Sequence, residues 1–293
     1  MVELLKRRRF CYIFNTGVAW LSRRRIFAAF VLFSRGAILI GFILAVSLSA
    51  LWADNAAVLS SPPIFEHLLA EGHAAEAAFQ PERALVFFRH ALEQRPDDAR
   101  LLQAISKQLS DELDHVPDKA QRLTIEREAL ETAQRAVRLA PKDSLCLVAV
   151  AVCEGKLARD ADVRERIEAS REVKRWAEAA LQIDPKSEWA EHVLGMWNLE
   201  VAQISPTKRA LARMFYGDVP EGSFAEAVNH LRRSVELGQP VALHHLALGF
   251  AYSKTGDSAA ARVEWQRGLD LPSHDLPDET AKAQARDAMA KSD

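Results

Sequence analysis

Small and apolar side chains recur at a fixed spacing through most of the chain. They occupy positions i, i+4, i+7 and i+8, and a proline follows at or near i+12. This spacing places the side chains on one face of a helix, and the proline ends that helix. The five copies begin at Ala84, Ala129, Val173, Ala227 and Ala261. The pattern therefore predicts five helices that each pack through a narrow face.

A second helix is predicted before each of these five, and three of them carry glycine. Gly72, Gly195 and Gly249 occupy matching places, and the last two follow a leucine. Glycine inside a helix costs about 1 kcal/mol relative to alanine, so its recurrence indicates a tight helix crossing. Leu-Gly-x-x-Tyr, followed by an alanine and aromatic helix and then proline, resembles the tetratricopeptide repeat, most closely from Leu248 to Pro272. We expect an all-α protein, an α-solenoid of about five tetratricopeptide-like helix pairs.

The period of the repeats is irregular, which indicates longer helices or inserted loops. The repeat prolines are unevenly spaced and stand at Pro96, Pro141, Pro185, Pro240 and Pro272. Insertions are predicted at residues 114–118, at residues 159–162 and, largest of all, at residues 204–223. Residues 277–291 are polar and alanine-rich and predict a C-terminal cap helix, because the end of a solenoid needs a polar outer face. The repeat domain is assigned to residues 64–293.

The N-terminal part of the chain differs from this body in charge and hydropathy. Residues 1–35 hold eight basic residues and one acidic residue, and residues 36–53 hold no charge. An 18-residue apolar helix spans roughly 27 Å, enough for the hydrocarbon core of a bilayer. The sequence therefore predicts a basic segment (1–35), a transmembrane anchor or signal segment (36–53) and a linker (54–63). A buried core helix is the remaining alternative for residues 36–53.

The arginines before the apolar segment would keep the N-terminus in the cytoplasm. The predicted localisation is thus a membrane, with a single-pass N-terminal anchor and the repeat domain on the far side, periplasmic in a bacterium. The alternatives are a secreted or periplasmic protein after signal cleavage, or a mitochondrial protein in a eukaryote.

The largest insertion carries a more specific resemblance. The features are an aromatic-bearing Leu194–Trp197 helix, the basic pair at 208–209, a Phe215-Tyr216-Gly217 loop with Pro220, and Ala225-Glu226-Ala227. Over residues 125–290 the chain resembles the regulator of microtubule dynamics family of divergent tetratricopeptide proteins. The resemblance implies a helical adaptor fold without enzyme activity. It also implies, from some members, links to a membrane anchor, microtubules, organelle tethering and lipid.

Candidate binding residues follow from the curvature of a solenoid, whose concave side is lined by the first helix of each pair. In repeats three to five the predicted inner-facing residues are apolar: Leu145, Val148, Val152, Trp189, Met196, Leu199, Leu243, Leu246 and Phe250. Either they form a groove for an amphipathic helix or an acyl chain, or they are ordinary contacts between helices. Repeats one and two instead offer Glu66, His73, Arg100, Gln103 and Lys107. In the insertion, Lys208, Arg209 and Arg213 are candidates for meeting a lipid headgroup or a partner's acidic residues, or they are a solvated face.

Other chemistries find little support in the sequence. No phosphate-binding loop, nucleophile elbow or zinc-type spacing is present, so we assign no catalytic residue, no metal and no cofactor. The acidic body gives no basic footprint for nucleic acid. The sequence thus favours a membrane-anchored scaffold or adaptor that binds a protein partner. The alternatives are a lipid- or hydrophobe-binding tethering module, a microtubule-associated regulator in a eukaryote, and an unrecognised enzyme or a regulatory subunit of one.

Overall fold

A computed structural model describes residues 64–113 and 116–291. Within those residues it contains twelve α-helices and no strand. The predictions for residues 1–35, 36–53 and 54–63 concern parts of the chain that lie outside the described residues.

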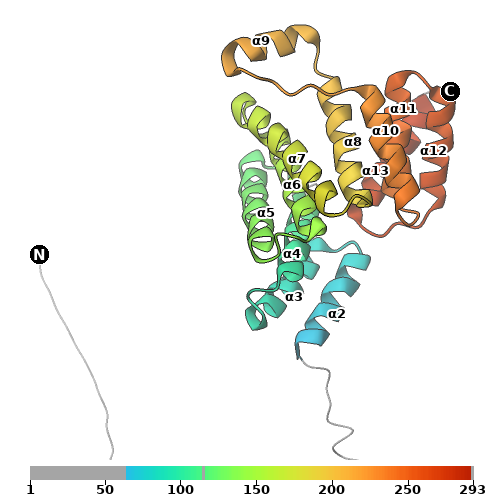
Figure 1. Ribbon diagram of the computed structural model, residues 1–293. Coiled ribbons are helices and arrows are strands. Elements are labelled where there is room, and N and C mark those ends of the chain that lie inside the picture. The colour runs from blue at the N-terminus through green and yellow to red at the C-terminus, as the bar shows by residue number, and fades with distance from the viewer. Residues whose placement is uncertain (1–63, 114–115, 292–293) are drawn as a thin grey trace, which may run out of the picture. The chain divides into compact units, whose positions relative to one another are not determined.

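Ten of the helices form five antiparallel pairs stacked in order along the chain (Figure 1). The pairs are α2 (Ile64–Ala77) with α3 (Pro81–Gln94), α4 (Ala99–Glu112) with α5 (Lys119–Leu139), α6 (Ser144–Asp160) with α7 (Val163–Ile183), α8 (Glu188–Ala202) with α10 (Phe224–Leu237), and α11 (Ala242–Thr255) with α12 (Ser258–Asp270). The predicted all-α solenoid of tetratricopeptide-like pairs is therefore confirmed. The remaining two helices are α9 (Pro206–Tyr216), inside the fourth pair, and the C-terminal α13 (Leu276–Lys291).

The turns between pairs explain why the repeat prolines recur. Pro96, Pro141 and Pro185 each follow the last residues of a pair, and two positions later an Asp or Ser caps the next helix. Such a side chain accepts a hydrogen bond from a free N–H of the first turn, which is worth about 1 kcal/mol. The proline therefore ends one pair, and the capping residue starts the next.

Tight crossings hold the two helices of a pair together where the sequence has its recurrent glycines. A Cβ added at Gly72 would clash with the Phe88 ring, and one at Gly249 would clash with the Trp265 ring. At Gly195 the added Cβ would lie 2.5 Å from Leu231 Cγ. Each glycine thus lets a large side chain of the second helix approach the backbone of the first.

The sequence separation between each of these glycines and its large partner shows that the fourth repeat is expanded. The glycine and its large partner have the same sequence separation in the first and fifth pairs, and more than twice that separation in the fourth. The extra length matches the insertion predicted at residues 204–223, which holds α9. The insertion predicted at residues 159–162 is wrong, because these residues form only the tight junction between α6 and α7. The extra length of that repeat lies in its helices, since α7 has 21 residues.

The predicted membrane localisation is corrected by the structure. No helix within residues 64–113 and 116–291 is long and apolar enough to cross a bilayer. The longest, α5 and α7, are amphipathic: each buries a row of alanines against its neighbour and carries charged residues on the other side. The segment at 36–53, from which the localisation was predicted, is outside the described residues.

Candidate functional site

The first helices of the second to fifth pairs form an inner row, which the C-terminal helix α13 extends. Helices α4, α6, α8, α11 and α13 contact one another in series. We call the surface of α2, α4, α6, α8 and α11 the concave face, because the first helices of stacked pairs line the inner side of a solenoid. The candidate binding residues lie on this face or in the insertion.

The nine apolar candidates of the concave face are all wholly or partly buried. Val148, Leu199 and Leu246 are buried, and the other six are half-buried. Eight of the nine, all except Leu145, join apolar clusters between helices. These contacts favour the interpretation of the eight as helix packing. As binding residues, all nine stay predictions.

An aromatic and histidine cluster fills the concave face between α8 and α11. The ring of Trp189 makes edge contacts with His192 and His244, at centroid distances of 5.9 and 4.7 Å. The two Nδ1 atoms of the histidines lie 3.1 Å apart, so one must donate a hydrogen bond and the other accept it. Burial and the neighbouring His244 hold the pKa of His192 well below its usual range, while burial and His245 lower the pKa of His244 to about 4. Both rings are therefore neutral at pH 7, and the cluster acts as polar packing.

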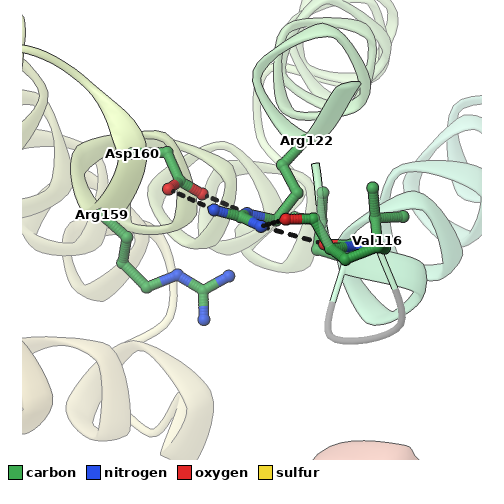
Figure 2. Close-up of a pocket in the computed structure, with 6 residues that line it drawn as sticks. Val116, Arg122, Arg159 and Asp160 are labelled. Atoms are coloured by element: carbon green, nitrogen blue, oxygen red, sulfur yellow. Dashed lines mark hydrogen bonds and ion pairs between the residues drawn. The ribbon is translucent and has the colours of Figure 1, made fainter. Parts of the chain in front are cut away.

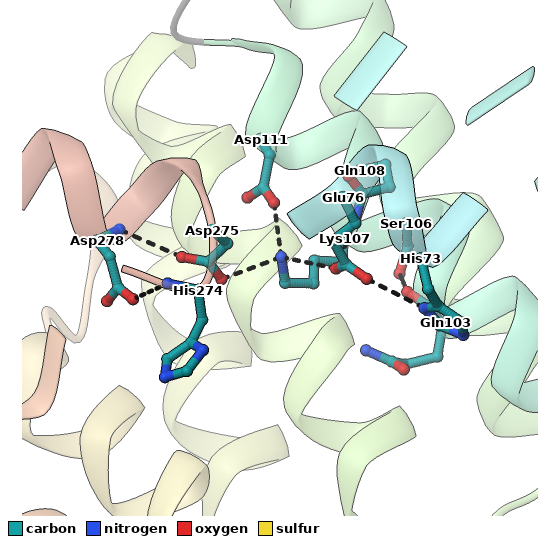
Figure 3. A network of polar contacts seen from close by, with 10 residues as sticks. All are labelled: His73, Glu76, Gln103, Ser106, Lys107, Gln108, Asp111, His274, Asp275 and Asp278. Atoms are coloured by element: carbon teal, nitrogen blue, oxygen red, sulfur yellow. Dashed lines mark hydrogen bonds and ion pairs between the residues drawn. The ribbon is translucent and has the colours of Figure 1, made fainter. Parts of the chain in front are cut away.

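A cluster of charges, the Lys107 cluster, occupies the other part of the concave face (Figure 3). The Nζ of Lys107 lies 2.8 Å from Asp111, 3.2 Å from Glu76 and 3.1 Å from Asp275. The three donors of one ammonium thus meet three carboxylates. Burial opposes the charge of Lys107, but Asp111, Asp275 and Glu76 outweigh this effect and raise its pKa.

This cluster joins segments that are far apart in the sequence. Glu76 lies near the end of α2, Lys107 and Asp111 belong to α4, and Asp275 directly precedes α13, the last helix of the described chain. The carboxylate of Asp278 fixes the loop by accepting hydrogen bonds from the backbone N–H groups of His274 and Leu243. The end of the solenoid therefore contacts its second pair. Sequence reasoning named Lys107 but missed the acidic partners, because only the i, i+4 spacing of Asp111 gives a local signal.

A small hollow opens beside the junction of α4 and α5 (Figure 2). Its lining is Leu113, Val116, Pro117, Arg122, Arg159 and Asp160. The guanidinium of Arg122 donates two hydrogen bonds to Asp160, at 2.7 and 2.9 Å, and two more to the carbonyls of Val116 and Pro117. Arg122 is thus committed to tying the α4–α5 connection to the end of α6.

One buried carboxylate lies on α5, one turn after Arg122. The side chain of Glu126 is 1% exposed, and neither oxygen has a hydrogen-bond partner among the described residues. Burial, helped by the negative charge of Asp160, raises its pKa to about 7. Within the described part of the chain no three His, Cys, Asp or Glu side chains gather as a metal site would require.

The insertion places its three basic candidates in different roles. Arg209 donates to the carbonyl of Val201 at 2.9 Å, and Arg213 pairs with Glu221. The ammonium of Lys208 has no partner among the residues that the structure describes, and the side chain points to solvent. The structure therefore does not gather the three cations into one site, and their binding role stays a prediction.

Stacked helix pairs with close glycine crossings, a row of inner helices and a capping helix define a tetratricopeptide-like helical-repeat protein. Residues 68–293 match the family model described as "Regulator of microtubule dynamics protein 1-3", and the chain belongs to this family. The resemblance carried by the insertion is thereby confirmed.

The sequence identity to individual members of the family is low. Regulator of microtubule dynamics protein 1 of Bos taurus is 26% identical over 161 residues, which cover 54% of this chain and 50% of that protein. The Pongo abelii protein of the same name is 22% identical over 192 residues, covering 64% of this chain and 61% of that protein. The chain thus spans only about half to three fifths of these relatives.

Among solved structures, the fold is similar to TTC0263, a thermophilic tetratricopeptide-repeat protein of Thermus thermophilus. The TM-score is 0.57 at 18% identity, covering 76% of this chain and 98% of that chain. This likeness shows the shared fold.

Proposed function

We propose that this protein is a non-catalytic scaffold that binds a protein partner along its concave face. Membership of a family of repeat proteins and the tetratricopeptide-like fold support the scaffold role. The observation that carries the choice of face is the set of polar groups that the inner helices α2 and α4 leave accessible. The side chain of His73 is 62% exposed, that of Arg100 is 57% exposed, and Gln103 is half-buried.

This polar part of the face suits hydrogen bonding to a peptide backbone and its side chains. The apolar candidates farther along contribute less free surface, because most are packed between helices. We therefore place the partner's main contact on α2 and α4, and a secondary contact on the half-buried Trp189 and Phe250. A lipid- or hydrophobe-binding role would need an open apolar groove, which these packed side chains do not favour.

A microtubule partner is supported only by the name of the family. Residues 64–293 hold 30 basic and 38 acidic residues, so this part of the chain carries a net charge of −8. An acidic filament surface would repel such a domain. We therefore rank direct filament binding below binding of a separate protein partner.

The experiment has two steps. First, the full chain is photo-crosslinked through a probe placed at position 103, and the captured protein is identified. Second, the affinity of that purified protein is measured for Gln103→Arg and for Gln266→Arg. Gln266 is the matched control, because it is exposed on α12, a second helix of its pair.

The expected result is a loss of affinity of at least tenfold for Gln103→Arg and no change for Gln266→Arg. Equal affinity of both variants and the wild type would move the binding surface away from the concave face. Circular dichroism and thermal melting of both variants would verify that each is folded.

A further inference from the structure

Helix α6, the inner helix of the third pair, has a buried carboxylate in its contact with each of its two chain neighbours. Glu126 of α5 lies in the α5–α6 contact, where it continues the buried row of Ala129 and Ala133 at helical spacing. Glu154 of α6 is 7% exposed and faces α7. Both carboxylates therefore occupy positions between packed helices that are otherwise filled mostly by small and apolar side chains.

The surroundings of Glu126 do not compensate an ionised carboxylate well. Neither of its oxygens has a hydrogen-bond partner among the described residues, and the negative charge of Asp160 on α6 adds to the effect of burial. Three cations act in the opposite direction more weakly: Arg159 and Lys156 of α6, and Arg122 of α5 itself. Helix α4 packs against the same row through apolar side chains. Burying the charged form of Glu126 is therefore costly, whereas the protonated form fits.

The surroundings of Glu154 have the same character. Burial raises its pKa to about 7, helped by the negative charges of Glu172 and Glu165 on α7. Arg175 of α7 lowers the pKa, but this arginine is already paired with Glu172. Helices α4 and α8 pack against α6 mainly through apolar side chains. The contacts of α6 with α5 and with α7 thus each hold a carboxylate that fits best when protonated.

We propose that the third pair is a pH-dependent hinge, closed while Glu126 and Glu154 are protonated and loosened when they ionise. An ionised carboxylate needs water, which enters most easily from the hollow beside the α4–α5 junction (Figure 2). Three residues that line this hollow, Arg122, Arg159 and Asp160, are also the charged groups that act on Glu126. The hinge is independent of the proposed concave-face function.

The direction of the response follows from the two states of the hinge. In the loosened state both carboxylates regain their ordinary pKa of 4.5, against about 7 in the closed state. Loosening therefore becomes easier as pH rises from 4.5 to 7, by at most about tenfold per pH unit for each group, and levels off above 7. Because the third pair lies between the first two pairs and the last two, its loosening lets these two parts of the solenoid move relative to each other.

The test is hydrogen exchange of the full chain, measured by mass spectrometry at pH 5.5 and 7.5. Exchange is expressed as protection factors, which remove the intrinsic pH dependence of the chemistry. In the wild type we expect the protection of α6 peptides to fall at least about tenfold between the two pH values, and in Glu126→Gln/Glu154→Gln by less than about threefold. Peptides of α3, in the first pair, should change by less than about threefold in both proteins, because the loosening is local.

The matched control is Glu131→Gln/Glu178→Gln, which neutralises two exposed carboxylates on α5 and α7 and should behave like the wild type. A fall of equal size in the α6 and α3 peptides would reduce the effect to global unfolding and overturn the hinge. So would a fall of wild-type size in the Glu126→Gln/Glu154→Gln variant.

A second measurement uses the wild type alone, so it does not depend on the folding of any variant. Cys153 directly precedes Glu154 and is 2% exposed, so iodoacetamide reaches its thiol only when α6 loosens. Ionisation of the thiol by itself raises the alkylation rate about tenfold per pH unit. Between pH 5.5 and 7 we expect the rate at Cys153, resolved by mass spectrometry, to rise more steeply than that. A rise of about tenfold per unit or less would contradict the hinge.

Discussion

The close approach of α8 and α10 predicts that alanine at position 195 destabilises the domain although alanine favours helices. A Cβ at Gly195 would lie 2.5 Å from Cγ, 2.9 Å from Cδ2 and 3.1 Å from the backbone nitrogen of Leu231. The side chain of Leu231 is itself fully buried and cannot swing into solvent. The two helices must therefore separate or the leucine must leave its rotamer.

Two opposing contributions to the free energy of unfolding set the size of this destabilisation. Replacing glycine by alanine inside a helix gains about 1 kcal/mol, whereas overpacking a filled core costs about 1–3 kcal/mol. The balance of the two terms is a loss of about 0–2 kcal/mol, and because the clashing Leu231 side chain is fully buried, we expect Gly195→Ala to lower the free energy of unfolding by about 1–2 kcal/mol. Gly155→Ala on α6 is the matched control: its Cβ would meet only Val173, at 3.8 Å, so we expect a gain of about 0.5–1 kcal/mol.

The assay is thermal and urea unfolding of the wild type and both variants, with the midpoints compared at one protein concentration. The two variants should lie on opposite sides of the wild type, separated by several degrees. A further variant, Gly195→Ala/Leu231→Ala, should cost less than the sum of its single changes, because the smaller side chain relieves the clash. A Gly195→Ala variant as stable as Gly155→Ala would refute the assigned crossing of α8 and α10.

The buried charges give three more predictions. The pKa of Glu126 is about 7 in the folded chain against 4.5 in the unfolded chain, so the domain loses stability as pH rises from 4.5 to 7. Glu126→Gln should remove that loss, and urea unfolding at pH 8 should show a free energy of unfolding about 1–3 kcal/mol higher than that of the wild type. The lowered pKa values of His192 and His244 act in the opposite direction, because stability is lost as pH falls from about 6.5 towards 4. In His244→Phe the urea midpoint should therefore depend less on pH over that range. Lys107→Met leaves three carboxylates facing one another and should cost about 1–3 kcal/mol in thermal unfolding, whereas Asp275→Asn should cost about 0.5–1 kcal/mol because two carboxylates still hold the lysine. A smaller effect for Lys107→Met than for Asp275→Asn would contradict the central position of the lysine.

The helix pairs could be predicted from the sequence because they depend on local signals. Alanines at helical spacing, a proline and a capping side chain all act within a short stretch of chain, so each copy carries its own evidence. The glycine contacts also gave a correct prediction, since a recurrent glycine in a helix has a cost that only close packing explains. The length of the third repeat was misassigned because a short polar junction looks the same whether it is an insertion or a tight turn.

The concave face could not be predicted in the same way. Whether Leu246 faces a groove or a neighbouring helix depends on a rotation of about 100° per residue, and the structure places it against Gly268. The partnership of Lys107 with Asp275 depends on the curvature of the whole solenoid, which accumulates from small rotations at every interface between pairs. No short stretch of sequence therefore predicts this curvature or the contact that depends on it.

The contact between Asp275 and Lys107 also limits how this chain can change in length. Solenoids are usually open-ended, so a duplicated pair lengthens the array and leaves every existing contact intact. Here an added pair would move Asp275 away from Lys107 by roughly 10 Å, the thickness of one helix layer, and no ion pair spans that gap. Five pairs is thus the number at which the last loop reaches the second pair. Adding or removing a pair would therefore break the contact between the last loop and the second pair.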